Sequence, residues 1–175
     1  MMRNRWVLGT VVLLFLGVGI LLLLPNPWRL PLREQLQARG FLSYTHSEAV
    51  SMAYRRCGAC HEIDKVTKYC ARCGPPFIVV THFMKKYIEI SQSQGGTIPQ
   101  LTDAELVTIV QVWNGLVGNW EADWRPQDLQ KLVKGNKALL DLLATPAGSR
   151  PIEAALKGGH APGSYKEQMA VEPGK

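Results

Sequence analysis

The chain has 175 residues, of which 46% are hydrophobic and 19% charged, and its formal net charge is +6. This length suits about one domain with an extension. Residues 1–39 hold five arginines and one glutamate, so +4 of the net charge lies near the N-terminus. The remainder contains no dense basic helix with interleaved aromatic residues, and nucleic-acid binding is therefore excluded as the expected function.

An uncharged run of nineteen residues, 6–24, follows the short basic start. As a helix it would span roughly 28 Å, close to the ~30 Å hydrocarbon core of a bilayer. Neither a small-x-small cleavage site nor a cysteine for lipidation follows this run. We expect residues 1–24 to be a retained single-pass transmembrane signal-anchor, in contact with membrane lipid. Arginines on both sides of the run leave its orientation open.

Residues 25–40 contain three prolines and predict a stiff stalk between the anchor and the folded part. Trp28 is the kind of aromatic residue that lies at the level of the lipid headgroups.

Beyond the stalk, the patterns predict helices. Thr45–Glu48 and Thr102–Glu105 match the capping box, in which the threonine accepts from the third residue's amide and the glutamate reaches back. Apolar residues recur with a helical period after both boxes and after the Gly74-Pro75-Pro76 break. The predicted helices cover residues 46–57, 77–92 and 103–115, with a polar loop over 62–76. Since no segment alternates as a strand would, the expected fold class is mainly α.

The sequence Cys57-Gly58-Ala59-Cys60-His61 carries the clearest chemistry. Two thiols three residues apart can add to the two vinyl groups of one haem, and the histidine that follows is placed to bind the iron. The motif predicts one covalent haem c, with Cys57 and Cys60 as anchors and His61 as proximal ligand.

Residues 41–118 resemble a small monohaem class I cytochrome c. In that family an N-terminal helix ends at the C-x-x-C-H motif, and a C-terminal helix with an aromatic residue packs across it. The resemblance implies these roles for the helices at 46–57 and 103–115, and it makes Trp113 the packing aromatic residue.

The second axial ligand departs from the family pattern. Many such cytochromes have a methionine and a proline just before the last helix, but this chain has Ile98-Pro99, and isoleucine cannot bind iron. We favour Met84 on the middle helix, and His82 is the first alternative. An open site is a further alternative, as is a ligand from elsewhere in the chain. Such ligands are Met52, His46, His160 and Met169.

Cys70 and Cys73 form a second C-x-x-C pair, separated from Cys60 by nine residues. In an oxidising compartment their expected state is a disulfide. All four cysteines together would also suit a tetrahedral zinc-ribbon or rubredoxin-like iron site, which is the main alternative to haem. A second haem at Cys73 is not expected, because Gly74 stands where the histidine would be needed.

Residues 119–175 match no part of the cytochrome pattern. Pro126 suits the start of a helix that we expect to run to about residue 144, with an apolar stripe that packs on the domain or docks to a membrane partner. The glycine-rich last 25 residues predict an extended arm.

Together these features predict an electron-transfer protein. It would be held in the cell membrane with its haem domain on the periplasmic or equivalent exported side. The expected partner is a membrane redox complex, such as a quinol-oxidising complex, an oxidase, a photosynthetic reaction centre or a dehydrogenase. No catalytic constellation accompanies the haem motif, so an enzyme is not expected. The same motif would also suit a structural subunit of a large membrane assembly or a haem-based gas sensor.

Overall fold

The structure is a computed structural model that describes residues 12–13, 16, 19, 26–69 and 74–167. In these ranges the chain forms helices and no strand, so the prediction of a mainly α fold is confirmed. None of the helices built from described residues is long and apolar enough to cross a bilayer. Most of the predicted membrane segment, residues 6–24, lies outside the described ranges.

The chain divides into two units, residues 1–36 and residues 37–175. Helix α2, Asn26–Ala38, occupies most of the predicted stalk, so the stalk is helical. Pro27 falls in the first turn, where its missing N–H leaves no bond unmade, whereas Pro31 lies inside the helix and removes one backbone hydrogen bond.

The second unit is built around three helices that the sequence predicts closely. They are α3 (His46–Gly58), α5 (Phe77–Ser93) and α6 (Asp103–Leu116). Both predicted capping boxes are present: the amides of Glu48 and Glu105 donate to the hydroxyls of Thr45 and Thr102, and the glutamates accept from the threonine amides.

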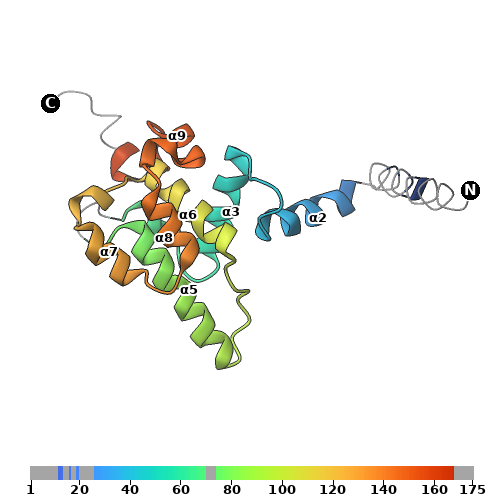
Figure 1. The fold of residues 1–175 in the computed structure, drawn as a ribbon, viewed down its shortest axis with the longest axis horizontal. Coiled ribbons are helices and arrows are strands. Elements are labelled where there is room, and N and C mark those ends of the chain that lie inside the picture. Colours follow the sequence, from blue (N-terminus) through green and yellow to red (C-terminus); the bar gives the residue numbers. More distant parts are fainter. Residues whose placement is uncertain (1–11, 14–15, 17–18, 20–25, 70–73, 168–175) are drawn as a thin grey trace, which may run out of the picture. The chain divides into compact units, whose positions relative to one another are not determined.

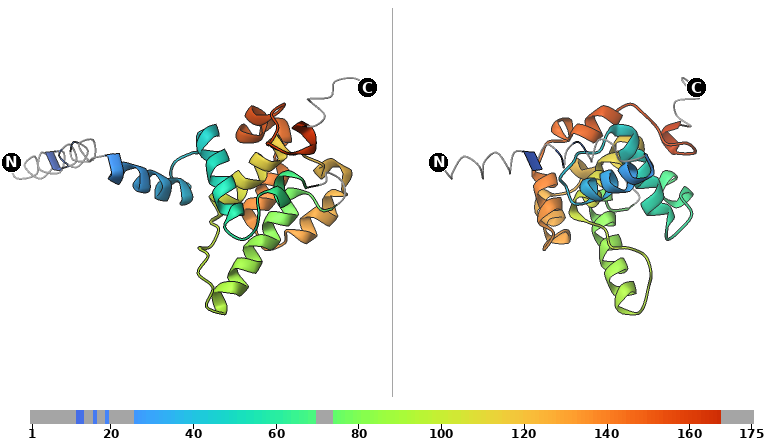
Figure 2. Two further views of the ribbon diagram at one scale, coloured as in Figure 1. Left: turned by 180° about the vertical axis from the view of Figure 1, so that it is seen from behind. Right: turned by 90° about the vertical axis from the view of Figure 1, so that its right-hand side faces the viewer.

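Helix α6 lies at the centre of this unit and packs against α3, α5, α8 (Lys137–Ala144) and α9 (Pro151–Leu156) (Figure 1). Most of its residues are buried, and Leu106, Val110 and Val112 have no exposed surface. Burial of apolar surface on this scale is the main favourable contribution to the stability of a domain. Helix α5 begins in the core, but its C-terminal half projects from the unit, with Tyr87 and Ile90 exposed (Figure 2).

The prediction of a single helix from residue 126 to about 144 is wrong. Helices α7 (Pro126–Leu132) and α8 (Lys137–Ala144) replace it. The chain turns at Gly135, whose φ of +90° is a conformation that glycine adopts easily, and the Asn136 side chain then caps α8 by accepting from the Leu139 amide at 3.0 Å.

The apolar stripe of this region packs within its own unit. Leu129, Val133 and Leu139 are at most 1% exposed, and they belong to the same core cluster as α3 and α6. The stripe therefore contributes to the core that holds the C-x-x-C-H helix in place.

Two other segments also contain helix that the sequence did not predict. The polar loop includes α4 (Asp64–Thr67), and the predicted extended arm includes α9 (Pro151–Leu156). Short 3₁₀ turns at Glu121–Asp123 (η1) and Ala147–Ser149 (η2) complete the fold. The backbones of α6 and α9 approach so closely that a Cβ at Gly115 would lie 2.7 Å from the Cβ of Leu156.

Candidate functional site

The candidate site begins where α3 ends. One face of α3 is buried through Ala49, Met52, Ala53 and Cys57, and the helix stops at Gly58. Cys60 is exposed in the turn that follows, and His61 is half-buried. The two thiols of the motif thus lie in different surroundings, one inside the core and one at the surface.

The Cys57 thiol is held by α6. Its sulfur accepts a hydrogen bond from the indole Nε1 of Trp113 at 3.3 Å, and the Trp113 ring lies 5.0 Å from the ring of Tyr54 on α3. Trp113 therefore packs against the motif helix, as the resemblance implied. Burial raises the pKa of Cys57 to about 11, although the hydrogen bond from Trp113 acts in the opposite direction. The folded chain keeps this thiol protonated at neutral pH.

His61 is oriented by a backbone carbonyl. Its Nδ1 lies 3.0 Å from the carbonyl oxygen of Glu62, which can only accept, so Nδ1 carries the proton in this contact. The acceptor lone pair of the neutral ring then belongs to Nε2. Metal-binding histidines commonly have this arrangement, in which the second nitrogen donates to a carbonyl and fixes the tautomer.

Aromatic side chains close the loop that follows the motif. The rings of Tyr69, Phe77 and Trp120 lie 5.3–5.8 Å apart, and Trp120 Nε1 donates to the carbonyl of Gly74 at 3.0 Å. Phe77 also lies 6.4 Å from Trp113, so this cluster continues to the Cys57 thiol. Cys70 and Cys73 lie outside the described residues, and their predicted disulfide stays a prediction.

The two favoured candidates for a second ligand differ in burial. Met84 is half-buried and packs against the core. His82 is only 4% exposed, and neither of its ring nitrogens has a hydrogen-bond partner within the described part of the chain. Burial lowers the pKa of His82, the charges of Lys86 and Lys85 lower it further, and Glu89 raises it. The imidazole is therefore neutral at pH 7, which is the form that binds metals.

The remaining candidates are spread over the unit. Met52 is buried in the core, and His46 and His160 are exposed. Ile98, which stands in the family's methionine position, is half-buried and packs against the core. Met169 lies outside the described residues.

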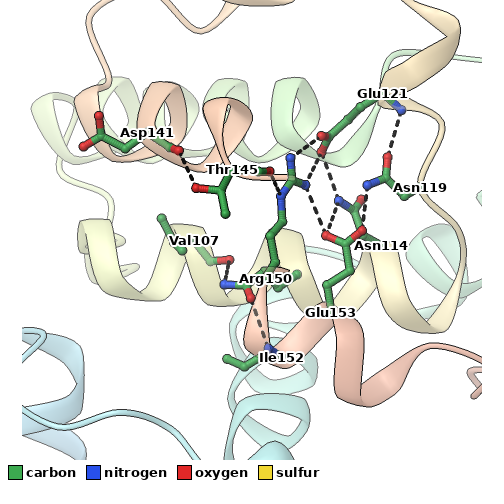
Figure 3. A network of polar contacts seen from close by, with 10 residues as sticks. Val107, Asn114, Asn119, Glu121, Asp141, Thr145, Arg150, Ile152 and Glu153 are labelled. Carbon is green, nitrogen blue, oxygen red and sulfur yellow. Dashed lines mark hydrogen bonds and ion pairs between the residues drawn. The ribbon is translucent and has the colours of Figure 1, made fainter. Parts of the chain in front are cut away.

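The sequence did not indicate a buried ion network that includes Asn114 of α6 (Figure 3). Arg150 is 2% exposed and pairs with Glu121 at 2.6 Å and with Glu153 at 3.1 Å. Asn114 of α6 donates to both carboxylates, and Asn119 donates to Glu153. Burial alone would lower the pKa of Arg150, but the two glutamates raise it, so the guanidinium keeps its charge. No periodic pattern marks partners this far apart in sequence.

The order of the motif residues fits a haem, and no described residue pairs with the Nε2 of His61. His82 provides a buried imidazole without a partner among the described residues. Over the ranges that the structure describes, no three His, Cys, Asp or Glu side chains gather as a metal site would require. Comparisons with protein-family models, curated proteins and solved structures found no match.

Proposed function

We propose that this chain transfers electrons through one covalently bound haem c. The observation that carries the proposal is the C-x-x-C-H sequence at the end of α3, with His61 held by the Glu62 carbonyl through Nδ1 and without a described partner at Nε2. When bound, the haem supplies a one-electron couple whose potential depends on its axial ligands and surroundings.

The chain's own residues have separate tasks in this proposal. Cys57 and Cys60 hold the haem through thioether bonds, and His61 binds its iron. Trp113 fixes the position of Cys57 and so of the haem edge attached to it. Met84 or His82 would provide the second protein ligand of the iron.

The proposed setting is a membrane. Residues 1–24 would anchor the chain, and the haem domain would lie on the periplasmic or equivalent exported side, where thioether assembly occurs. There it would exchange electrons with a membrane redox complex of the quinol-oxidising, oxidase, reaction-centre or dehydrogenase type. Support comes from the uncharged run at 6–24 together with the haem motif. The mature chain is expected to begin at or near Met1 and to stay with membranes in high salt, and an N-terminus beyond Pro25 would contradict this.

A pyridine haemochrome spectrum and an intact mass of the purified full-length chain test the haem. We expect one haem c per chain and a mass equal to polypeptide plus one haem. The Cys57→Ser/Cys60→Ser double variant should lose the covalent haem, whereas His160→Ala, at an exposed position, should retain it. A mass equal to the bare polypeptide would refute the proposal, and stoichiometric zinc would favour a four-cysteine site.

A further inference from the structure

The imidazole of His82 is buried without any hydrogen bond from the described residues. It is 4% exposed, and no described residue donates to or accepts from Nδ1 or Nε2. Such groups are rare in folded proteins, because the hydrogen bonds to water that burial removes are normally replaced. Coordination to a metal ion would give one of these nitrogens the partner that it lacks.

None of the described residues forms a hydrogen bond with His82, although the charges of Lys86, Lys85 and Glu89 act on its pKa. Ile78 and Val79, one turn earlier on α5, are fully apolar, and the Phe83 ring meets the imidazole edge-on at 5.7 Å. Lys85 is occupied by an ion pair with Asp103 at 3.0 Å. The chain has therefore buried an imidazole among groups that leave its nitrogens unused.

The side chain of Met84, unlike that of His82, is explained by packing alone. Two residues along a helix correspond to a rotation of about 200°, so the side chains of His82 and Met84 leave α5 on nearly opposite sides. Met84 packs against the core, and its thioether is a weak acceptor that needs no partner when buried. Met84 is thus accounted for by packing, whereas His82 is not. One haem iron can meet only one of them while α5 keeps its present rotation.

Helix α5 also starts beside the motif. Phe77, its first residue, lies 6.4 Å from the ring of Trp113, and Trp113 donates to the sulfur of Cys57. His82 follows five residues later, about 7.5 Å along the helix axis. The imidazole therefore lies on the same helix as the residue that packs on Trp113, more than one helical turn further along.

We propose that His82, and not Met84, is the second axial ligand of the iron, an inference that rests on the haem proposed above. The iron would then have two histidine ligands, His61 and His82. Methionine in this position raises the reduction potential, so a bis-histidine haem would work at a lower potential than the sequence-based choice of Met84 implies.

Absorption and electron paramagnetic resonance spectra of the ferric, full-length, haem-loaded chain test this assignment. We expect a low-spin spectrum without the weak sulfur-to-iron charge-transfer band at its red end. His82→Ala should become high-spin, and added imidazole should restore the low-spin form. Met84→Leu should leave the spectrum and the potential unchanged. His160→Ala, which removes an exposed histidine, serves as the matched control.

A gain-of-signal variant completes the test. His82→Met should create the charge-transfer band and raise the potential. The inference is overturned if wild type shows this band and Met84→Leu abolishes it, or if wild type is already high-spin. Should His82→Ala fail to accumulate, the wild-type and Met84→Leu spectra still decide. A chain without haem would instead refute the proposed function itself, and the pyridine haemochrome separates that result from a wrong ligand.

Discussion

Two neighbouring residues of α6, Trp113 and Asn114, lead into buried regions of opposite character. On the Trp113 side the contacts are aromatic and apolar, and one N–H to sulfur bond holds Cys57. On the Asn114 side a guanidinium, two carboxylates and two amides satisfy one another (Figure 3).

The two regions differ in whether their polar side chains have hydrogen-bond partners among the described residues. The Arg150 network is complete, so its contribution is to hold the C-terminal helices on α6. In contrast, no described residue pairs with the Nε2 of His61 in the motif or with either ring nitrogen of His82 on α5. The proposed haem would use these nitrogens, whereas the ion network is expected to affect stability alone.

Removing the central cation should have the largest effect. Arg150→Leu leaves Glu121 and Glu153 buried and next to each other without their shared partner. Loss of one member of a buried ion pair costs about 3–5 kcal/mol, and we expect the free energy of unfolding to fall by this amount in urea titrations. Lys137→Ala removes an exposed ion pair with Asp141, and its effect on the free energy of unfolding should be within experimental error. An equally small change for Arg150→Leu would show that the network does not depend on its cation.

The next effect concerns the thiols of the motif in chain produced without haem. With its pKa raised to about 11, only about one Cys57 thiol in a thousand is ionised at pH 8, and the core covers it. Alkylation followed by peptide mapping should modify exposed Cys60 at least about a hundredfold faster than Cys57. Denaturant should remove this difference. Equal rates in the folded chain would mean that Trp113 does not close over Cys57.

The close approach of α6 to α9 gives a smaller effect. At Gly115 an added methyl group would meet the Cβ of Leu156 at 2.7 Å, and this atom cannot swing away. Overpacking of this kind costs about 1–3 kcal/mol, so Gly115→Ala should lower the unfolding free energy and speed amide exchange in α9. Gly148→Ala is the control, since its methyl group would meet nothing within 4 Å. A neutral Gly115→Ala would contradict the tight α6–α9 contact.

The smallest effect is expected at the start of α6. Thr102→Ala removes the hydroxyl that caps the Glu105 amide at 3.2 Å, at a cost of about 1 kcal/mol, while Thr102→Ser should keep the cap. The loss of unfolding free energy in Thr102→Ala is compared with the loss in Arg150→Leu. We expect the local cap to contribute less to stability than the contacts between distant segments. A loss as large as that of Arg150→Leu would reverse this order.

Features encoded by neighbouring residues could be predicted from the sequence. Both capping boxes formed, and α3 and α6 begin at the residues that the boxes indicate. Gly135 and Asn136 interrupt the apolar stripe between α7 and α8, but the leucine spacing on both sides of them still favours a single helix. Helix α9 could not be predicted, because the glycine-rich residues around it favour an extended arm. Its contacts with α6, which no local pattern shows, stabilise it.

The same limit applies to the candidate site. The spacing of Cys57, Cys60 and His61 indicates haem chemistry by itself, since the three residues act together along five positions. The spacing of His82 and Met84 shows only that they leave a helix on opposite sides. Which of them is buried without a described partner depends on how α5 packs, and no local pattern reports that.

Residues far along the sequence stabilise α6, and this affects the order in which parts of the chain fold. Arg150 joins Glu121 across 29 positions, and Lys166 donates to the carbonyl of Gly115 across 51. A growing chain folds from its N-terminus, so the motif exists about ninety residues before Arg150 can neutralise Glu121. Helix α6 is completed partway through this interval, and from then on it still lacks its link to Arg150 through Glu153 and its hydrogen bond from Lys166. We therefore expect the Cys57 thiol to be more open to covalent modification before the C-terminal helices form than after.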